Sequence, residues 1–137
     1  MIANINTKVR PEAPPMRFPS QLDSRFLRRF VLRSHGLVEF IDVETVDWIE
    51  AEKGQVHLHL GTARRRLAEQ LGVLEQKLDP KSFLRIHRSV IVNRARVQRL
   101  EWNARADLRV VLDNGRRLAV GRQRTASVRT TLLETER

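Results

Sequence analysis

The sequence predicts a mainly β fold with one short α-helix. From Phe26 onward the chain consists mostly of short apolar segments separated by turn residues, the pattern of β-strands. One segment, at about residues 66–78, instead repeats leucine at helical spacing. Four of the five prolines fall in the first 19 residues, where apolar periodicity is absent. We therefore expect a Pro-rich flexible linker over residues 1–25, a folded domain over 26–134 and a short tail over 135–137.

Strands are expected wherever apolar residues alternate or run between turn residues. One starts at Phe30, and the others cover residues 38–43, 46–51, 56–60, 83–88, 90–92, 97–102, 108–112 and 118–120. The clearest hairpin turn is Asp113-Asn114-Gly115, because these residues adopt the positive φ angles of a tight turn. Residues 125–133 could close the domain with a short helix, although Thr and Val are weak helix formers.

The predicted helix has one apolar side. Leu67, Leu71, Leu74 and Leu78 form a single stripe, and polar residues occupy the opposite side. Asp79-Pro80 should end the helix, because a residue before proline avoids the helical conformation. We assign the leucine stripe to the core.

Composition excludes several classes of protein. The chain has 137 residues, the size of one domain, and no cysteine, so disulfides, thiolate metal sites and cysteine nucleophiles are absent. No apolar run approaches the ~20 residues of a membrane helix, and the first residues lack the apolar core of a signal peptide. We expect a cytoplasmic protein that does not cross a membrane.

The positive charge is concentrated in two windows. The formal net charge is +10, from 26 Lys and Arg against 16 Asp and Glu. Residues 81–100 and 115–130 contain no acid and together carry +11, so the rest of the chain sums to −1. Clustered positive charge favours a surface that faces a polyanion such as nucleic acid. The alternative is a set of solvated faces in an arginine-rich protein, since Arg outnumbers Lys 22 to 4.

Catalytic and metal-binding patterns are missing or weak. The sequence has no nucleophile elbow, Gly-rich phosphate loop or paired carboxylates, so we expect no enzymatic activity and no cofactor. His57 and His59 would share one side of a strand and could hold a metal with His35 or His87. We favour the simpler interpretation, in which the pair forms the polar side of an alternating strand and no metal binds.

Two polar segments interrupt the apolar strands. His87-Arg88-Ser89 lies between two of them, and Gly121-Arg122-Gln123-Arg124 follows the last. Arginine suits guanine in the major groove, glutamine suits adenine, and serine can reach phosphate. Either segment could also be an ordinary exposed loop.

The sequence resembles the LytTR DNA-binding domain family. Residues 83–93, FLRIHRSVIVN, are similar to the family signature, a Phe-x-Arg-x-His-Arg-Ser core followed by an apolar triplet and Asn. VDWIEAEKG (46–54), the leucine helix and NGRRLAVGR (114–122) resemble further blocks in the same order. The resemblance covers roughly residues 28–133. It implies an elongated, antiparallel, multi-sheet fold whose loops enter neighbouring major grooves of double-stranded DNA.

The resemblance also implies roles for individual residues. Arg88, Arg122 and one residue of the 54–57 loop, either Gln55 or His57, would contact bases. His87, Ser89 and Asn93 would orient the loops or touch the DNA backbone. The two basic windows supply further candidates for backbone contacts: Lys81, Arg85, Arg94, Arg96, Arg116, Arg117 and Arg124.

This sequence departs from the family pattern in two places. Gly121 stands where the family often has serine, and the loop after Gly54 is one residue shorter than usual.

From the resemblance as a whole we expect a transcription regulator that binds repeated half-sites, with two copies on each operator.

Two other interpretations stay open. One is a basic RNA-binding or ribosome-associated β protein, which would need aromatic residues for base stacking. The chain has two Trp, five Phe and no Tyr, most of them in apolar strand patterns. The other is an interaction module that has lost DNA binding, against which the intact His87-Arg88-Ser89 block argues.

Overall fold

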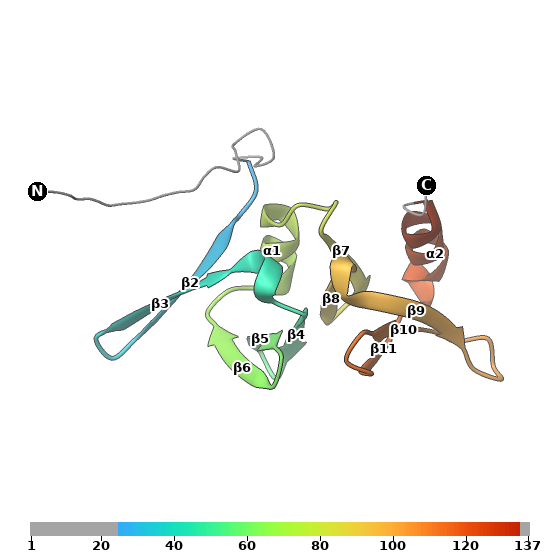
Figure 1. Cartoon of the computed structure of the whole chain (residues 1–137), viewed down its shortest axis with the longest axis horizontal. Coiled ribbons are helices and arrows are strands. Elements are labelled where there is room, and N and C mark those ends of the chain that lie inside the picture. Colours follow the sequence, from blue (N-terminus) through green and yellow to red (C-terminus); the bar gives the residue numbers. More distant parts are fainter. Residues whose placement is uncertain (1–24, 135–137) are drawn as a thin grey trace, which may run out of the picture.

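Three antiparallel sheets lie side by side in an elongated row, with a helix against each of the two larger sheets (Figure 1). The computed structural model describes residues 25–134. The predicted mainly β, multi-sheet fold is confirmed. The strands are β2 (Arg29–Ser34), β3 (Leu37–Asp42), β4 (Trp48–Glu52), β5 (Gln55–Leu60), β6 (Ala63–Leu67), β7 (Phe83–His87), β8 (Val90–Asn93), β9 (Val97–Trp102), β10 (Leu108–Leu112) and β11 (Arg117–Ala119). The helices are α1 (Leu71–Lys77) and α2 (Thr125–Glu134).

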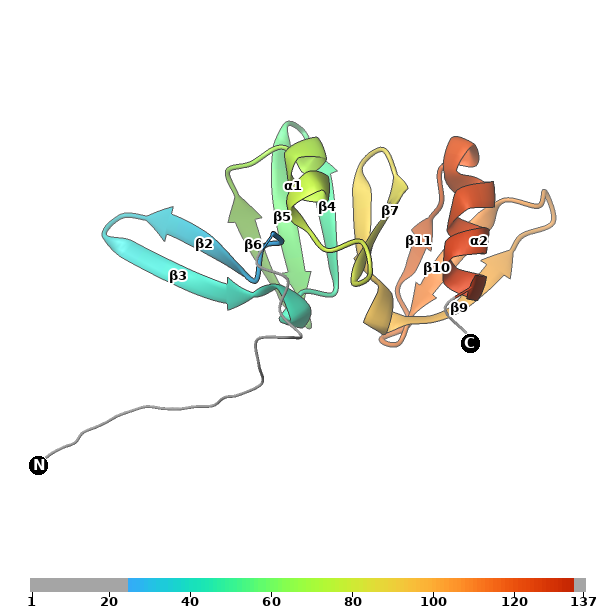
Figure 2. The ribbon, with the colours of Figure 1, turned by 90° about the horizontal axis from the view of Figure 1, so that it is seen from above.

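The central sheet has five strands in the order β6-β5-β4-β8-β7. Strand β4 pairs on one side with β5, where Trp48 faces His59, and on the other with β8, where Trp48 faces Val92. The β2–β3 hairpin projects from one end of the row, and the sheet β11-β10-β9 stands at the other (Figure 2).

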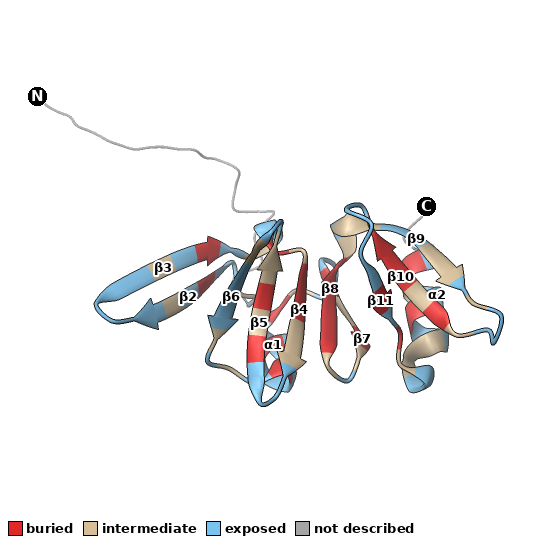
Figure 3. Ribbon diagram, turned by 90° about the horizontal axis from the view of Figure 1, so that it is seen from below, coloured by how far each residue is buried: buried red, intermediate tan, exposed pale blue. Residues whose placement is uncertain are grey.

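The central sheet separates two apolar cores. Successive strand residues point to opposite faces, so Ile49 enters the core beneath α1 while Trp48 enters the core shared with β10 and α2. Strand β8 is buried along its whole length, because it lies between β4 and β7 with a core on each face of the sheet (Figure 3). This position explains why Val90-Ile91-Val92 is a continuous apolar run rather than an alternating one.

The first helix is shorter than the sequence predicts. It begins at Leu71 instead of residue 66, because residues 63–67 form β6, an edge strand paired with β5. Leu67 ends that strand and still packs against the core that contains Leu71, Leu74 and Leu78. The assignment of the leucine stripe to the core is therefore confirmed, although Leu67 reaches the core from a strand.

The C-terminal segment forms a second helix, which the sequence left as an option. Helix α2 spans ten residues and buries Val128 and Leu132 against the three-stranded sheet. The proposed tail at 135–137 lies outside the described residues, as does the proposed linker except for Arg25. Within residues 25–134, neither helix is long and apolar enough to cross a membrane.

Candidate nucleic-acid interface

Three turns from distant parts of the sequence meet at one edge of the molecule. The turn after β4 lies beside the turn after β7, because the Ala51 amide donates a hydrogen bond to the Ser89 carbonyl at 2.9 Å. The Gly121 amide donates to the Ile86 carbonyl at 2.7 Å and adds the third segment. Figure 2 shows these turns along the upper side of the ribbon. We call residues 53–55, 87–89 and 121–124 together the basic edge; its cations are Lys53, Arg88, Arg122 and Arg124.

The turn at His87-Arg88-Ser89 is held from inside while Arg88 is left open. His87 Nδ1 accepts a hydrogen bond from the Ser89 amide at 3.1 Å and lies 2.9 Å from Ser89 Oγ. Arg85 donates to the carbonyls of His87 and Arg88. The Arg88 side chain is exposed and forms no hydrogen bond or ion pair with any residue from 25 to 134. The turn therefore presents an unpaired guanidinium on a fixed backbone.

The Gly121–Arg124 segment packs on this turn. A Cβ added to Gly121 would meet His87 Cα at 3.7 Å, which is an ordinary van der Waals contact. Arg122 is 88% exposed, and its Nε lies 3.7 Å from Asp107 Oδ1. An ion pair this long and exposed contributes little to the stability of the fold. Arg122 therefore remains available to a ligand.

The turn between β4 and β5 places the side chains of Gln55 and His57 differently. Lys53 and Gly54 both have positive φ angles, 53° and 77°, and form a tight two-residue turn. Gln55 is exposed at the tip, whereas His57 lies two residues inside the strand, half-buried, with Nδ1 3.0 Å from Arg64 Nη2. Gln55 is therefore better placed than His57 to contact a ligand at the basic edge. Lys53 lies in the same turn and is a further cation of this edge. The sequence analysis missed it, although the Lys-Gly pair between two strands marks a turn.

Other basic residues from the two windows lie at the opposite ends of the same strands. They are Lys81, Arg94, Arg96, Arg116 and Arg117, which we call the far edge. Several already have partners within the chain. Arg94 donates to the Pro80 carbonyl at 2.7 Å, Arg117 donates to Glu101 at 3.0 Å, and Arg116 lies over the Trp48 ring at 4.9 Å. The fold thus divides the predicted basic surface between two edges.

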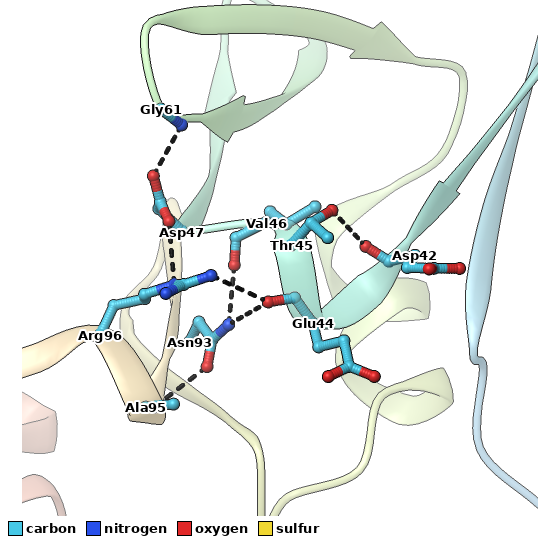
Figure 4. A network of polar contacts seen from close by, with 9 residues as sticks. All are labelled: Asp42, Glu44, Thr45, Val46, Asp47, Gly61, Asn93, Ala95 and Arg96. Carbon is cyan, nitrogen blue, oxygen red and sulfur yellow. Dashed lines mark hydrogen bonds and ion pairs between the residues drawn. The ribbon is translucent and has the colours of Figure 1, made fainter. Parts of the chain in front are cut away.

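Asn93 is part of the structure's interior and not of its surface. It is 3% exposed, and its Nδ2 donates to the carbonyls of Val46 and Glu44 while Oδ1 accepts from the Ala95 amide. Arg96 joins the same network through Asp47 at 3.1 Å (Figure 4). These contacts tie the end of β8 to the segment before β4. Asn93 therefore has no exposed group to offer DNA.

The histidine pair on β5 has contacts of another kind. His59 stacks on Trp48 with 3.9 Å between ring centroids, and its Nε2 lies 3.1 Å from Glu50 Oε1. Burial lowers the pKa of His59, and the hydrogen bond to Glu50 opposes this effect. In the described part of the chain, no three His, Cys, Asp or Glu side chains gather in a way that could hold a metal ion.

A mainly β module that exposes the arginines Arg88 and Arg122 in turns along one edge has the features of a polyanion-binding domain. The model of the LytTr DNA-binding domain family matches residues 37–133, and the chain belongs to this family. The family is defined by a DNA-binding domain and not by a catalytic one.

Similar proteins include transcription regulators from several bacteria. The chain is 33% identical over 90 residues to the CO-responsive transcriptional regulator RcoM of Rhodospirillum rubrum, covering 66% of this chain and 38% of that protein. It is 22% identical over 116 residues to the transcriptional regulatory protein LytR of Staphylococcus aureus, covering 85% and 47%. The chain therefore spans less than half the length of these relatives.

A solved structure has the same fold. The LytTr DNA-binding domain of a methyl-accepting/DNA response regulator from Bacillus cereus superimposes with a TM-score of 0.67 at 24% identity, covering 78% of this chain and 97% of that one.

Proposed function

We propose that this chain binds double-stranded DNA sequence-specifically and that Arg88 and Arg122 read bases in the major groove from the basic edge. One observation carries the proposal. The Arg88 guanidinium has no partner among the described residues, while hydrogen bonds from Arg85 to the His87 carbonyl and from the Ser89 amide to His87 Nδ1 fix the turn that bears it. Arginine held in this way can donate two parallel hydrogen bonds to guanine O6 and N7.

The remaining residues of the basic edge take supporting roles. Gln55 is the third candidate for a base contact, and Lys53 and Arg124 are placed to neutralise phosphates. His87 and Ser89 orient the turn, since their side chains bond within it. We do not assign the far edge to the same duplex face.

The regulatory setting belongs to the proposal as well. Family membership and the named relatives support a role in bacterial transcription regulation. We propose in addition that the protein acts in the cytoplasm and binds repeated half-sites as two copies. The proposed activity is binding alone and includes no catalytic step.

Selection of random duplexes by the purified protein tests the proposal. It should yield a preferred sequence that binds at least about 10³-fold more tightly than a scrambled duplex at equal salt, the lower end of specific recognition. Replacing its guanines singly with 7-deazaguanine removes N7 from the major groove and leaves base pairing intact. Loss of affinity at two positions is expected, and full tolerance of every replacement would rule out the major-groove reading.

Competition with single-stranded RNA tests the main alternative. Base stacking on a sheet face needs neighbouring exposed aromatics. Trp48, Phe30 and Phe83 are buried, whereas the exposed Phe40 and Trp102 stand on different sheets, each beneath an arginine. We therefore expect the selected duplex to compete far better than RNA, and the reverse order would favour the RNA-binding interpretation.

A further inference from the structure

Arg85 contacts the turn that bears Arg88 and the first helix at the same time. Its side chain is 16% exposed. Nε donates to the His87 carbonyl at 3.2 Å, Nη2 donates to the Arg88 carbonyl, and Nη1 donates to Glu75 Oε1 at 2.9 Å. One guanidinium thus joins two carbonyls of the turn to a carboxylate of α1.

The backbone of β7 needs these hydrogen bonds. The β7–β8 register shifts between Arg85 and His87, so the strand bulges just before the turn. A bulge interrupts the ladder and leaves backbone groups without strand partners. The Ile86 carbonyl is satisfied by the Gly121 amide at 2.7 Å, and the next two carbonyls are satisfied by Arg85. The Arg85 side chain therefore completes the hydrogen bonding of an irregular segment.

Helix α1 fixes the other end of the contact. Leu74, directly before Glu75, is buried and holds the helix against the core. Gly72 lies above the guanidinium, since a Cβ added there would be 4.0 Å from Arg85 Nη1. The carboxylate is therefore delivered by an element that cannot easily move away from the sheet.

We propose that Glu75 and Arg85 form a clamp that positions the turn His87–Ser89, so that base specificity at Arg88 depends on a carboxylate in α1. The inference rests on the proposed base contact of Arg88. It assigns Arg85 a positioning role instead of the phosphate contact that its place in a basic window suggested. A charge-assisted hydrogen bond network of this kind restricts the turn more than neutral bonds would.

Three substitutions and one matched control test the clamp in the full chain. Arg85→Met removes all three donors, Arg85→Lys keeps the charge but loses the planar fork, and Glu75→Gln removes the charge of the acceptor. The control is Glu69→Gln, which weakens a second ion pair, 2.8 Å between Lys77 in α1 and Glu69 just before α1. Each variant is titrated against the selected duplex and a scrambled one over a range of salt, with folding checked by melting.

The clamp predicts a loss confined to the specific duplex. Arg85→Met and Arg85→Lys should both weaken it about 5- to 100-fold, up to the discrimination of one bidentate base contact. Glu75→Gln should weaken it in the same direction by less, and Glu69→Gln should change nothing. The scrambled duplex and the slope of affinity against salt should stay constant. If Arg85→Met instead weakens both duplexes equally and reduces that slope by about 0.9, Arg85 is a phosphate contact and the inference is overturned.

NMR of the DNA-free protein separates this inference from the proposed function. Glu75→Gln, the milder change, should shift the backbone amide signals of residues 87–89, whereas Glu69→Gln should leave them in place. Unchanged signals at 87–89 would overturn the clamp, whatever Arg88 does on DNA. Arg88→Ala tests the base contact by itself: if specificity survives this change, the proposed role of Arg88 fails while the amide shifts still decide the clamp.

Discussion

Arginines that look equivalent in the sequence differ in what surrounds them. Arg85 and Arg88 are three residues apart in the same acid-free window, yet the guanidinium of Arg85 has three internal acceptors and that of Arg88 has none among residues 25–134. Arg94 is likewise engaged by the Pro80 carbonyl. A guanidinium that already satisfies internal acceptors would have to break those bonds to reach DNA. Charge count therefore overestimates the number of arginines available to a ligand.

Replacing Arg88 with lysine should separate base reading from charge attraction. Lysine keeps the charge but has no planar fork, so affinity for the selected duplex should fall by about 1–3 kcal/mol and one operator position should lose its preference. Affinity for a scrambled duplex should hold. Titration of both duplexes at one salt concentration measures the difference. Arg117→Lys, on the far edge, is the control, and equal losses on both duplexes would make Arg88 a phosphate contact.

Gly121 offers a second test at a single residue. Its φ of −63° suits any residue, and a Cβ would meet only ordinary contacts at 3.7–3.8 Å. Gly121→Ala should therefore stabilise the fold by about 0.4–1 kcal/mol by restricting the unfolded chain. Gly121→Ser, the residue often found in the family, should match that and bind DNA more tightly than the alanine variant through its hydroxyl. A loss of stability in both variants would show that the segment cannot accept a side chain.

At the scale of elements, alternation and turn residues predicted the strands with a clear two-residue period. Strand β6 was missed because its sequence, Ala-Arg-Arg-Arg-Leu, shows no alternation; three exposed arginines follow one another on an edge strand. Leu67 lies four residues before Leu71, so its spacing mimicked a helical turn. Helix α2 was left as an option because its burial of Val128 and Leu132, and not its propensity, stabilises it.

The candidate site was only partly visible in the sequence. Both polar segments were identified, but their contact through Gly121 and Ile86 depends on tertiary structure. Burial of Asn93 depends on carbonyls more than 40 residues away in the chain. Strand direction alone decides that Arg122 lies on the basic edge and Arg117 on the far edge. The residues of one segment do not show which distant segment it will contact in the folded protein.

Helix α1 provides the test of packing. Leu74 is 1% exposed in the core between α1 and the central sheet. Leu74→Ala should therefore destabilise the protein by about 2–5 kcal/mol through lost burial and the cavity left behind. Val73, its neighbour, is 38% exposed, and Val73→Ala should change stability by less than about 0.5 kcal/mol. Denaturant titration of both variants measures these values. Similar small effects for both would mean that α1 is not packed as described.

The contact between β4 and β5 predicts a pH dependence of stability. Burial lowers the pKa of His59, so the unfolded chain binds a proton more readily than the folded one. The free energy of unfolding should therefore decrease as pH falls below about 6.5, the usual His value, until the lowered folded pKa is passed. His59→Phe keeps an aromatic ring beside Trp48 and should remove this component, whereas His35→Phe at the exposed hairpin turn should not. Identical pH profiles for wild type and His59→Phe would contradict the assignment.

At the scale of the whole molecule, the fold distributes positive charge unevenly. The net charge of +10 is not gathered on one face, because strand direction sends part of each basic window to the far edge. The turn beside Arg122 carries one charge of each sign, on Arg105 and Asp107, and so adds no net charge. The basic edge itself retains four cations, Lys53, Arg88, Arg122 and Arg124. A duplex bound there should therefore respond to those four charges and not to the total.

The dependence of affinity on salt tests this division. Each neutralised phosphate contributes about 0.9 to the slope of log K against log salt, so four cations predict a slope of about −3.6 on a scrambled duplex. Lys53→Gln with Arg124→Gln removes two charges from the basic edge and should bring the slope to about −1.8. Lys81→Gln with Arg117→Gln removes the same charge from the far edge, so the net charge matches while the slope should not change. Titration of the three proteins over one salt series measures all the slopes. Equal reductions in both double variants would show that DNA responds to the overall charge of the domain and would contradict a binding surface confined to the basic edge.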